Sequence, residues 1–204
     1  MKKIKSLFIR EFENHNTCNI TDKVEVGCEW VLNEECIATE KIDGTCCLIQ
    51  DNKIYRRFDF KEGRKLPNRA IPCQEKADET TGHFPHWVLC EENNPMDKYH
   101  IEAFKQKENW ENGTYELIGK HFQANPYELQ NDILEKHGSR IINCKLKSFD
   151  AIKEYLYNHN IEGIVFYRNN GEMCKIKKTD FMFYWNGKNY KLKTNSIHDK
   201  ESGV

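Results

Sequence analysis

The chain has 204 residues, of which 31% are charged, and its formal net charge at pH 7 is -1. This length allows one large domain or two small ones with a substantial core, and the charge excludes a strong overall basic field, so nucleic-acid binding would need a local basic face. No apolar run is long enough for a membrane span or a signal-peptide core. The odd number of cysteines, nine, favours reduced thiols in an intracellular compartment, cytoplasmic or nuclear.

The first half of the chain predicts a β-hairpin followed by irregular structure. Residues 45–50 (TCCLIQ) and 53–58 (KIYRRF) flank the polar pair Asp51 and Asn52, a pattern typical of two strands joined by a tight turn. Residues 61–94 carry most of the prolines and many charges, and therefore indicate no regular element.

The second half predicts helices between strands. The expected helices begin at Asp97 as N-cap and run to about residue 109, cover residues 127–136, and follow Ser148 as N-cap. The expected strands cover residues 114–118, 161–167 and 172–178. The chain is thus predicted to be an α+β domain over residues 1–185, with antiparallel sheets flanked by helices, followed by a polar segment over 186–204 with a frayed end.

Five short segments combine residue types suited to nucleotide chemistry. They are residues 40–44 (EKIDG), 55–59 (YRRFD), 115–119 (YELIG), 161–166 (IEGIVF) and 175–177 (KIK). In a strand, positions two apart share a face, so Lys175 and Lys177 are expected to point to the same side. Two such like charges repel unless an anion lies between them, and a triphosphate is such an anion.

This ordered set resembles the motifs of the covalent nucleotidyltransferase superfamily, which contains ligases and mRNA capping enzymes. The resemblance spans residues 40–178 and implies a ligase adenylation domain in which Lys41 attacks the α-phosphorus of ATP and forms a lysyl-AMP intermediate. Nearby cations would favour the neutral, nucleophilic form of Lys41. Lys175 and Lys177 would stabilise the charge that develops on the α-phosphate.

The resemblance also implies roles for the other matching residues. Arg57 would bind a phosphate or the ribose, since Arg56 points to the opposite face of its strand. Glu116 would accept a hydrogen bond from a ribose hydroxyl. Glu162 would bind Mg²⁺ or Mn²⁺, and Asp43, followed by Gly44, would orient Lys41 or help to hold the metal. Glu40 would lie beside the adenine.

Ligases and capping enzymes of this superfamily often add an oligonucleotide-binding barrel after the Lys-x-Lys motif. The stretch that follows Lys178 here is too short for a five-stranded barrel, so none is expected. The chain resembles compact 5′-to-3′ RNA ligases of the vertebrate RNA ligase 1 type in the strings EKIDGTCC and YELIG, in residues 125–127 (NPY), and in the expected lack of a barrel. The expected substrates are ATP and RNA with 5′-phosphate and 3′-hydroxyl ends, used by a monomer. The alternatives are a GTP-dependent capping-type guanylyltransferase and a non-catalytic domain that binds RNA ends.

Three features depart from that resemblance or compete with it. Residues 140–143 (RIIN) lie where relatives often carry a purine-stacking aromatic, so an aliphatic contact to the purine is expected. Basic residues of the irregular segment could contact RNA, namely Lys61, Arg64, Lys65 and Arg69. His83, His86 and Cys90 could also bind zinc, with Cys73 or His100 as a fourth ligand.

Overall fold

The computed structural model describes residues 2–13, 16–61, 63, 65–79 and 82–186. Within these residues the protein is an α+β fold of mostly strands with three α-helices, α1 (Trp30–Asn33), α2 (Lys98–Phe104) and α3 (Phe149–Asn158), and two 3₁₀ turns, Pro95–Asp97 and Lys178–Phe181. None of these described helices has the length and apolar character to cross a membrane. The expectations for Arg64 and for residues 187–204 lie outside the described residues.

A four-stranded sheet has the order β1 (Lys5–Ser6), β12 (Met173–Lys177), β11 (Gly163–Tyr167) and β4 (Ile37–Lys41). The pairs β12–β11 and β11–β4 are antiparallel, whereas β1 pairs with β12 in parallel. Apolar side chains of these strands form the larger core with α3, α1 and the antiparallel hairpin of β2 (Phe8–Glu13) and β3 (Asn16–Val24). This core holds the strands that carry Lys41 and Lys175.

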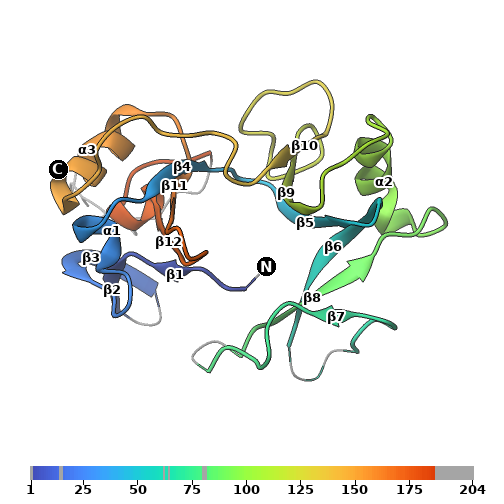
Figure 1. Cartoon of the computed structure of the whole chain (residues 1–204), viewed down its shortest axis with the longest axis horizontal. Coiled ribbons are helices and arrows are strands. Elements are labelled where there is room, and N and C mark those ends of the chain that lie inside the picture. Colours follow the sequence, from blue (N-terminus) through green and yellow to red (C-terminus); the bar gives the residue numbers. More distant parts are fainter. Residues whose placement is uncertain (1, 14–15, 62, 64, 80–81, 187–204) are drawn as a thin grey trace, which may run out of the picture.

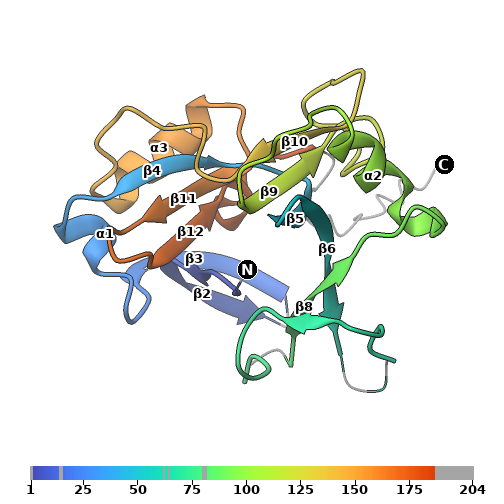
Figure 2. The ribbon, with the colours of Figure 1, turned by 45° about the vertical axis from the view of Figure 1, so that its right-hand side comes forward.

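A six-stranded sheet has the order β10 (Ile133–Lys136), β9 (Gly113–Ile118), β5 (Thr45–Gln50), β6 (Lys53–Phe60), β8 (Phe84–Leu89) and β7 (Ile71–Pro72). All of its pairs are antiparallel. Its apolar face packs with α2 in a second, smaller core. The two larger sheets lie in different halves of the molecule, and the segment that leads into β1 runs between them (Figures 1 and 2).

Several predicted elements are confirmed. The hairpin of β5 and β6 turns at Asp51 and Asn52, whose φ angles of 51° and 54° are the left-handed values that such a tight turn requires. Helix α3 is capped by the Ser148 side chain, which accepts a hydrogen bond from the backbone of Ala151. The strands β9, β11 and β12 fall within or beside their predicted ranges.

Two predicted helices are wrong in type or extent. Residues 127–136 form a loop and the strand β10, because Glu128 has a φ of 53°, which interrupts a helix, and Ile133–Lys136 pairs with β9. The helix expected from Asp97 ends at Phe104, and Asp97 is not a side-chain cap; Asn94 instead caps the preceding 3₁₀ turn. Tertiary pairing outweighed local periodicity in the first case.

Some strands were not predicted. Strand β8 forms within residues 61–94, where the sequence indicated no regular element, and no prediction covered the hairpin β2–β3. The parallel β1–β12 pair departs from the expected antiparallel sheets. All three sheets formed by the described residues are open, with two edge strands each.

The expectation that the thiols are reduced is wrong for two cysteines. Cys28, before α1, forms a disulfide with Cys174 of β12, and the two Cα atoms are 6.2 Å apart. Both side chains are buried in the larger core. The disulfide therefore links the segment before α1 to the strand that carries Lys175.

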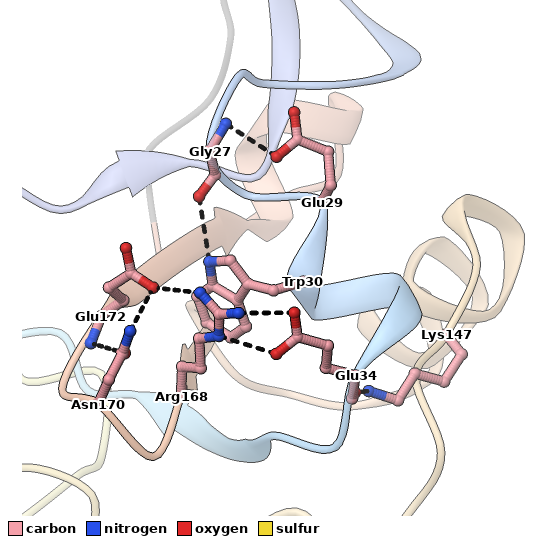
Figure 3. A network of polar contacts seen from close by, with 8 residues as sticks. All are labelled: Gly27, Glu29, Trp30, Glu34, Lys147, Arg168, Asn170 and Glu172. Atoms are coloured by element: carbon pink, nitrogen blue, oxygen red, sulfur yellow. Dashed lines mark hydrogen bonds and ion pairs between the residues drawn. The ribbon is translucent and has the colours of Figure 1, made fainter.

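A polar network ties the turn between β11 and β12 to the region of α1 (Figure 3). Arg168 donates two hydrogen bonds to the carboxylate of Glu34, of 2.8 and 2.6 Å, and a third of 2.6 Å to Glu172. Its guanidinium also lies 6.0 Å from the ring centre of Trp30. Two-point contact with a carboxylate fixes geometry better than a single surface ion pair does. The network therefore anchors the start of β12, at the end of the strand away from Lys177.

Candidate active site

A cavity of about 170 Å³ lies where the two larger sheets face each other. The chain crosses from β4 of one sheet to β5 of the other through residues 42–44, so the EKIDG segment lies at the junction. The lining residues are Lys2, Lys3, Ile4, Glu40, Lys41, Ile42, Cys46, Arg57, Glu116, His137, Gly138, Val165, Tyr167 and Lys175. Five of the residues predicted from sequence, Glu40, Lys41, Arg57, Glu116 and Lys175, thus border one space.

Lys41, Lys175 and Lys177 are aligned by strand register. Gly163 of β11 is paired with both Lys41 of β4 and Lys177 of β12, while Lys175 is paired with Val165. A Cβ atom on Gly163 would lie 2.2 Å from the carbonyl oxygen of Ile176. Glycine at this position therefore lets β11 lie close to β12 beside Lys177.

The charge of Lys175 is weakened by its surroundings. Burial, followed by the nearby charges of Lys41, Lys177 and Arg10, lowers the pKa of this amine to about 8, while Glu162 opposes the shift. Grouped cations with little solvent are stabilised by an anion between them. The site is thus electrostatically suited to a phosphate group.

Lys41 is held by a carboxylate at the start of β11. Its Nζ atom lies 2.5 Å from Oε2 of Glu162, whose side chain is 9% exposed. Because Glu162 is almost buried and lies beside the cations of the site, it is well placed to bind a positively charged group, either an ammonium or a metal ion.

Glu116 of β9 is held by a backbone N–H group and a histidine ring. Its Oε1 accepts a 3.1 Å hydrogen bond from the backbone N–H of Gly44, and its Oε2 lies 2.8 Å from Nε2 of His137. A Cβ on Gly44 would lie 2.3 Å from the carbonyl oxygen of Leu117, so only glycine lets this loop approach β9 so closely. Burial and the neighbouring Glu116 raise the pKa of the Cys46 thiol to about 12, which keeps that thiol protonated.

Asp43 is not among the residues that line the cavity. Its Oδ2 accepts a 2.8 Å hydrogen bond from Nε1 of Trp185, and its backbone N–H donates to the hydroxyl of Tyr127 at 2.8 Å. Asp43 is 5% exposed and Trp185 2% exposed. These contacts fix the loop that follows Lys41. Lys177, which is paired with Gly163 of β11, is also not among the residues that line the cavity.

The neighbouring arginines of β6 lie on opposite faces of the strand. Arg57 lines the cavity and lies 3.2 Å from the exposed Asp59. Arg56 donates a 2.7 Å hydrogen bond to Asp97, which is fully buried. Only Arg57 is available to a ligand of the cavity.

Residues 140–143 are not among the residues that line this cavity, and an aliphatic contact from them to a purine stays a prediction. The guanidinium of Arg140 pairs with Glu40 at 3.1 Å and lies 5.0 Å from the ring centre of Tyr127, while Ile141 is 58% exposed. His137 lines the cavity instead, together with Tyr167.

Sequence reasoning missed His137, Tyr127 and Trp185. His137 directly follows β10, which was predicted as part of a helix. Tyr127 and Trp185 reach Asp43 across 84 and 142 residues of sequence. The only available signal was the NPY string, which marked Tyr127 without indicating its partner.

The residues that lie close enough together to bind a metal ion differ from the set expected for zinc. The ligand atoms of Cys90, Asp97 and His100 lie within 4.8 Å of one another, and so do those of Cys46, Glu116 and His137. His86 is in neither group, and its Nδ1 contacts the carbonyl of Phe84 at 2.8 Å. In the first group Asp97 is already paired with Arg56, a cation that opposes a metal ion there.

The basic residues of the irregular segment lie away from the cavity. Lys61, Lys65 and Arg69 are exposed, and none of them is among the cavity residues. Contact with RNA through these side chains remains a prediction.

Comparison with known proteins gives a consistent result. The family model for RNA ligase 1 matches residues 87–201, a range that contains Glu116, Glu162, Lys175 and Lys177. The RNA ligase 1 proteins of Rattus norvegicus and Pongo abelii are each 24% identical to the chain over 226 aligned positions, which cover 73% of this chain and 68% of the relative.

Proposed function

The chain belongs to the RNA ligase 1 family, and from that premise we propose that it is an ATP-dependent RNA ligase that works through a lysyl-AMP intermediate on Lys41. The observation that carries this proposal is the shared cavity, which Lys41, Lys175, Arg57 and Glu116 line together. Each of these residues belongs to a different one of the short segments, and two separate sheets bring them to one space.

In the first step, the neutral amine of Lys41 attacks the α-phosphorus of ATP. The Nζ–P bond forms, the bond from phosphorus to the bridging oxygen breaks, and pyrophosphate leaves, while the amine gives up one proton to the solvent and keeps one N–H. Positive charge on Lys175 and Lys177 offsets the negative charge that grows on the α-phosphate oxygens. Arg57 binds a phosphate group, because its planar guanidinium suits phosphate oxygens.

In the next two steps, AMP passes to RNA. The 5′-phosphate of one end attacks the lysyl phosphorus, which releases Lys41 and leaves an adenylylated end. The 3′-hydroxyl of the other end then attacks that 5′-phosphate and displaces AMP, so the strand is sealed. Glu116 accepts a hydrogen bond from a ribose hydroxyl of the nucleotide, and Glu40 lies beside the adenine.

The residues present fit a Mg²⁺ or Mn²⁺ ion at Glu162. This carboxylate is nearly buried and lies at the phosphate end of the site, next to Lys41, and Mg²⁺ binds through few carboxylates while it keeps several waters. When bound, the ion would neutralise phosphate charge. Asp43 acts chiefly on the loop of Lys41, since Trp185 and Tyr127 hold it.

The test is incubation of the purified chain with Mg²⁺ and α-labelled ATP or GTP, followed by denaturing electrophoresis, with Lys41→Ala beside the wild type. We expect a labelled band from ATP, none from Lys41→Ala, and joining of 5′-phosphorylated RNA by the wild type. Label from GTP would favour a capping-type guanylyltransferase. No label, together with no AMP in the intact mass of the purified chain, would leave a non-catalytic domain that binds RNA ends.

A further inference from the structure

His137 connects two neighbouring strands of the six-stranded sheet, β10 and β9, at the cavity. It follows β10 directly, and its backbone N–H donates a 3.1 Å hydrogen bond to the carbonyl of Thr114 in β9. Its ring lies between two side chains of β9: Nε2 is 2.8 Å from Oε2 of Glu116, and Nδ1 is 2.9 Å from Oγ1 of Thr114. Thr114, His137 and Glu116 therefore form a continuous chain of hydrogen bonds that ends at the cavity.

The chemistry of these partners fixes which ring nitrogen carries the proton. An ionised carboxylate only accepts hydrogen bonds, so Nε2 of His137 must donate to Glu116. In the neutral ring Nδ1 is then an acceptor, and the hydroxyl of Thr114 can donate to it. The Glu116 carboxylate therefore selects the form of His137 with a proton on Nε2, and the hydroxyl of Thr114 holds the other side of the ring.

We propose that His137 is a positioning residue that fixes the Glu116 carboxylate for a ribose hydroxyl of the nucleotide, through an Nε2–H donor on a ring that Thr114 holds at Nδ1. This inference rests on the proposed function, in which Glu116 accepts that hydroxyl. The backbone N–H of Gly44 holds the other carboxylate oxygen at 3.1 Å. With both oxygens held by donors, each still has a lone pair free for a ligand.

The burial of Glu116 explains why a second donor is needed. The Glu116 residue is 9% exposed, so little water is available to satisfy its charge. Without the ring of His137, Gly44 alone would hold the carboxylate, which could then rotate about its side chain. A carboxylate that must first be ordered binds its ligand more weakly, because the ordering entropy is lost on binding.

The test measures the affinity of the chain for AMP, 2′-deoxy-AMP and 3′-deoxy-AMP by calorimetry, since these ligands cannot react. His137→Phe keeps an aromatic ring and loses the donor, whereas His137→Gln offers an amide N–H near the position of Nε2. A hydrogen bond to a charged group lost in this way should raise the Kd for AMP about tenfold or more in His137→Phe. His137→Gln should recover most of that loss.

The deoxy ligands separate positioning from other roles. For the analogue that lacks the hydroxyl accepted by Glu116, His137→Phe should change the Kd by less than about threefold, because the contact is already absent. Thr114→Val should weaken AMP binding in the same ligand-selective way and Thr114→Ser should not, which gives a milder pair of variants should His137→Phe fold poorly. Equal losses for all three ligands would overturn the proposal, as would a His137→Phe chain that binds AMP like the wild type.

The wild-type controls distinguish this inference from the proposed function. A chain that binds AMP and yet forms no covalent adduct with ATP contradicts the proposed ligase, and the affinity pattern still decides the role of His137. A chain that forms the adduct on Lys41 but shows no ligand-selective loss contradicts only the inference. A wild type that binds none of the three ligands contradicts both.

Discussion

The two larger sheets hold their buried acids with different partners. The four-stranded sheet brings Glu40, Lys41 and Lys175 to the cavity, and Glu162, which precedes β11, is paired with Lys41. The six-stranded sheet brings Arg57 and Glu116, and Glu116 is held by the N–H groups of Gly44 and His137. The two acids are similarly buried, so their partners, and not their exposure, distinguish an acid suited to cations from one suited to a hydroxyl.

In each of the two larger sheets, the residues proposed to act on the nucleotide and the residues that stabilise the fold lie on opposite faces. The faces toward the cavity carry charged side chains, while the opposite faces form the two apolar cores. Variants on the two faces of one strand should therefore have different consequences.

The largest difference is expected between Arg56 and Arg57. Arg56→Met leaves the buried Asp97 without its cation, and should lower the free energy of unfolding by about 3 kcal/mol or more. Arg57→Met removes only a partly exposed pair and should change that free energy by less than about 1 kcal/mol, while it weakens adduct formation with ATP. Chemical denaturation and α-labelled ATP measure the two effects; equal behaviour of the two variants would contradict the separation by face.

Lys175→Ala tests the cationic sheet directly. Loss of one group that stabilises charge in the transition state should lower the rate of adduct formation about 10²- to 10³-fold. Lys153→Ala, on the exposed side of α3, is the matched control and should label at the wild-type rate. A Lys175→Ala chain that labels normally would remove this lysine from the mechanism.

Gly163→Ala tests how closely the lysine strands must pack. The new Cβ would lie 2.2 Å from the carbonyl oxygen of Ile176, so the strands must move apart, at a cost of about 1–3 kcal/mol in unfolding free energy, and adduct formation should fall as well. In Gly171→Ala the Cβ meets nothing within 4 Å, although φ is +86°. That variant should lose some stability and keep its labelling rate; loss of labelling there would point to a general effect of stability.

The pH dependence of labelling gives a smaller effect with a defined sign. The pKa of Lys175 in the folded chain is about 8, so its positive charge is present below that pH and is lost as the pH rises through it. We expect kcat/KM for adduct formation to fall about tenfold per pH unit above about 8. In Lys175→Arg the guanidinium stays charged, so the falling limb should move to higher pH, and an unchanged profile would contradict the assignment.

Local signals in the sequence predicted the parts of the site that local structure determines. The hairpin of β5 and β6 follows from its turn residues, and the alternation of side chains in β6 separated Arg56 from Arg57. Strand spacing likewise placed Lys175 and Lys177 on one face. In each case the relevant contacts lie within a few residues of chain.

The remaining parts depend on contacts between distant segments. The role expected of Asp43, to orient Lys41 or bind metal, stays a prediction; its contacts with Trp185 and Tyr127 could not be read from the residues around it. His137 was missed because residues 133–136 have a helical pattern, whereas pairing with β9 makes them a strand. The Cys28–Cys174 disulfide spans 146 residues, and cysteine count alone could not indicate it.

The most direct test of the account is the position of the covalent AMP. The chain is incubated with ATP and Mg²⁺, digested, and its peptides are analysed by mass spectrometry. We predict AMP on the peptide that contains Lys41, attached to its Nζ, and unmodified Lys175 and Lys177. An adduct on either of those lysines, or no adduct in a folded chain that binds ATP, would contradict the assignment of Lys41 as the nucleophile.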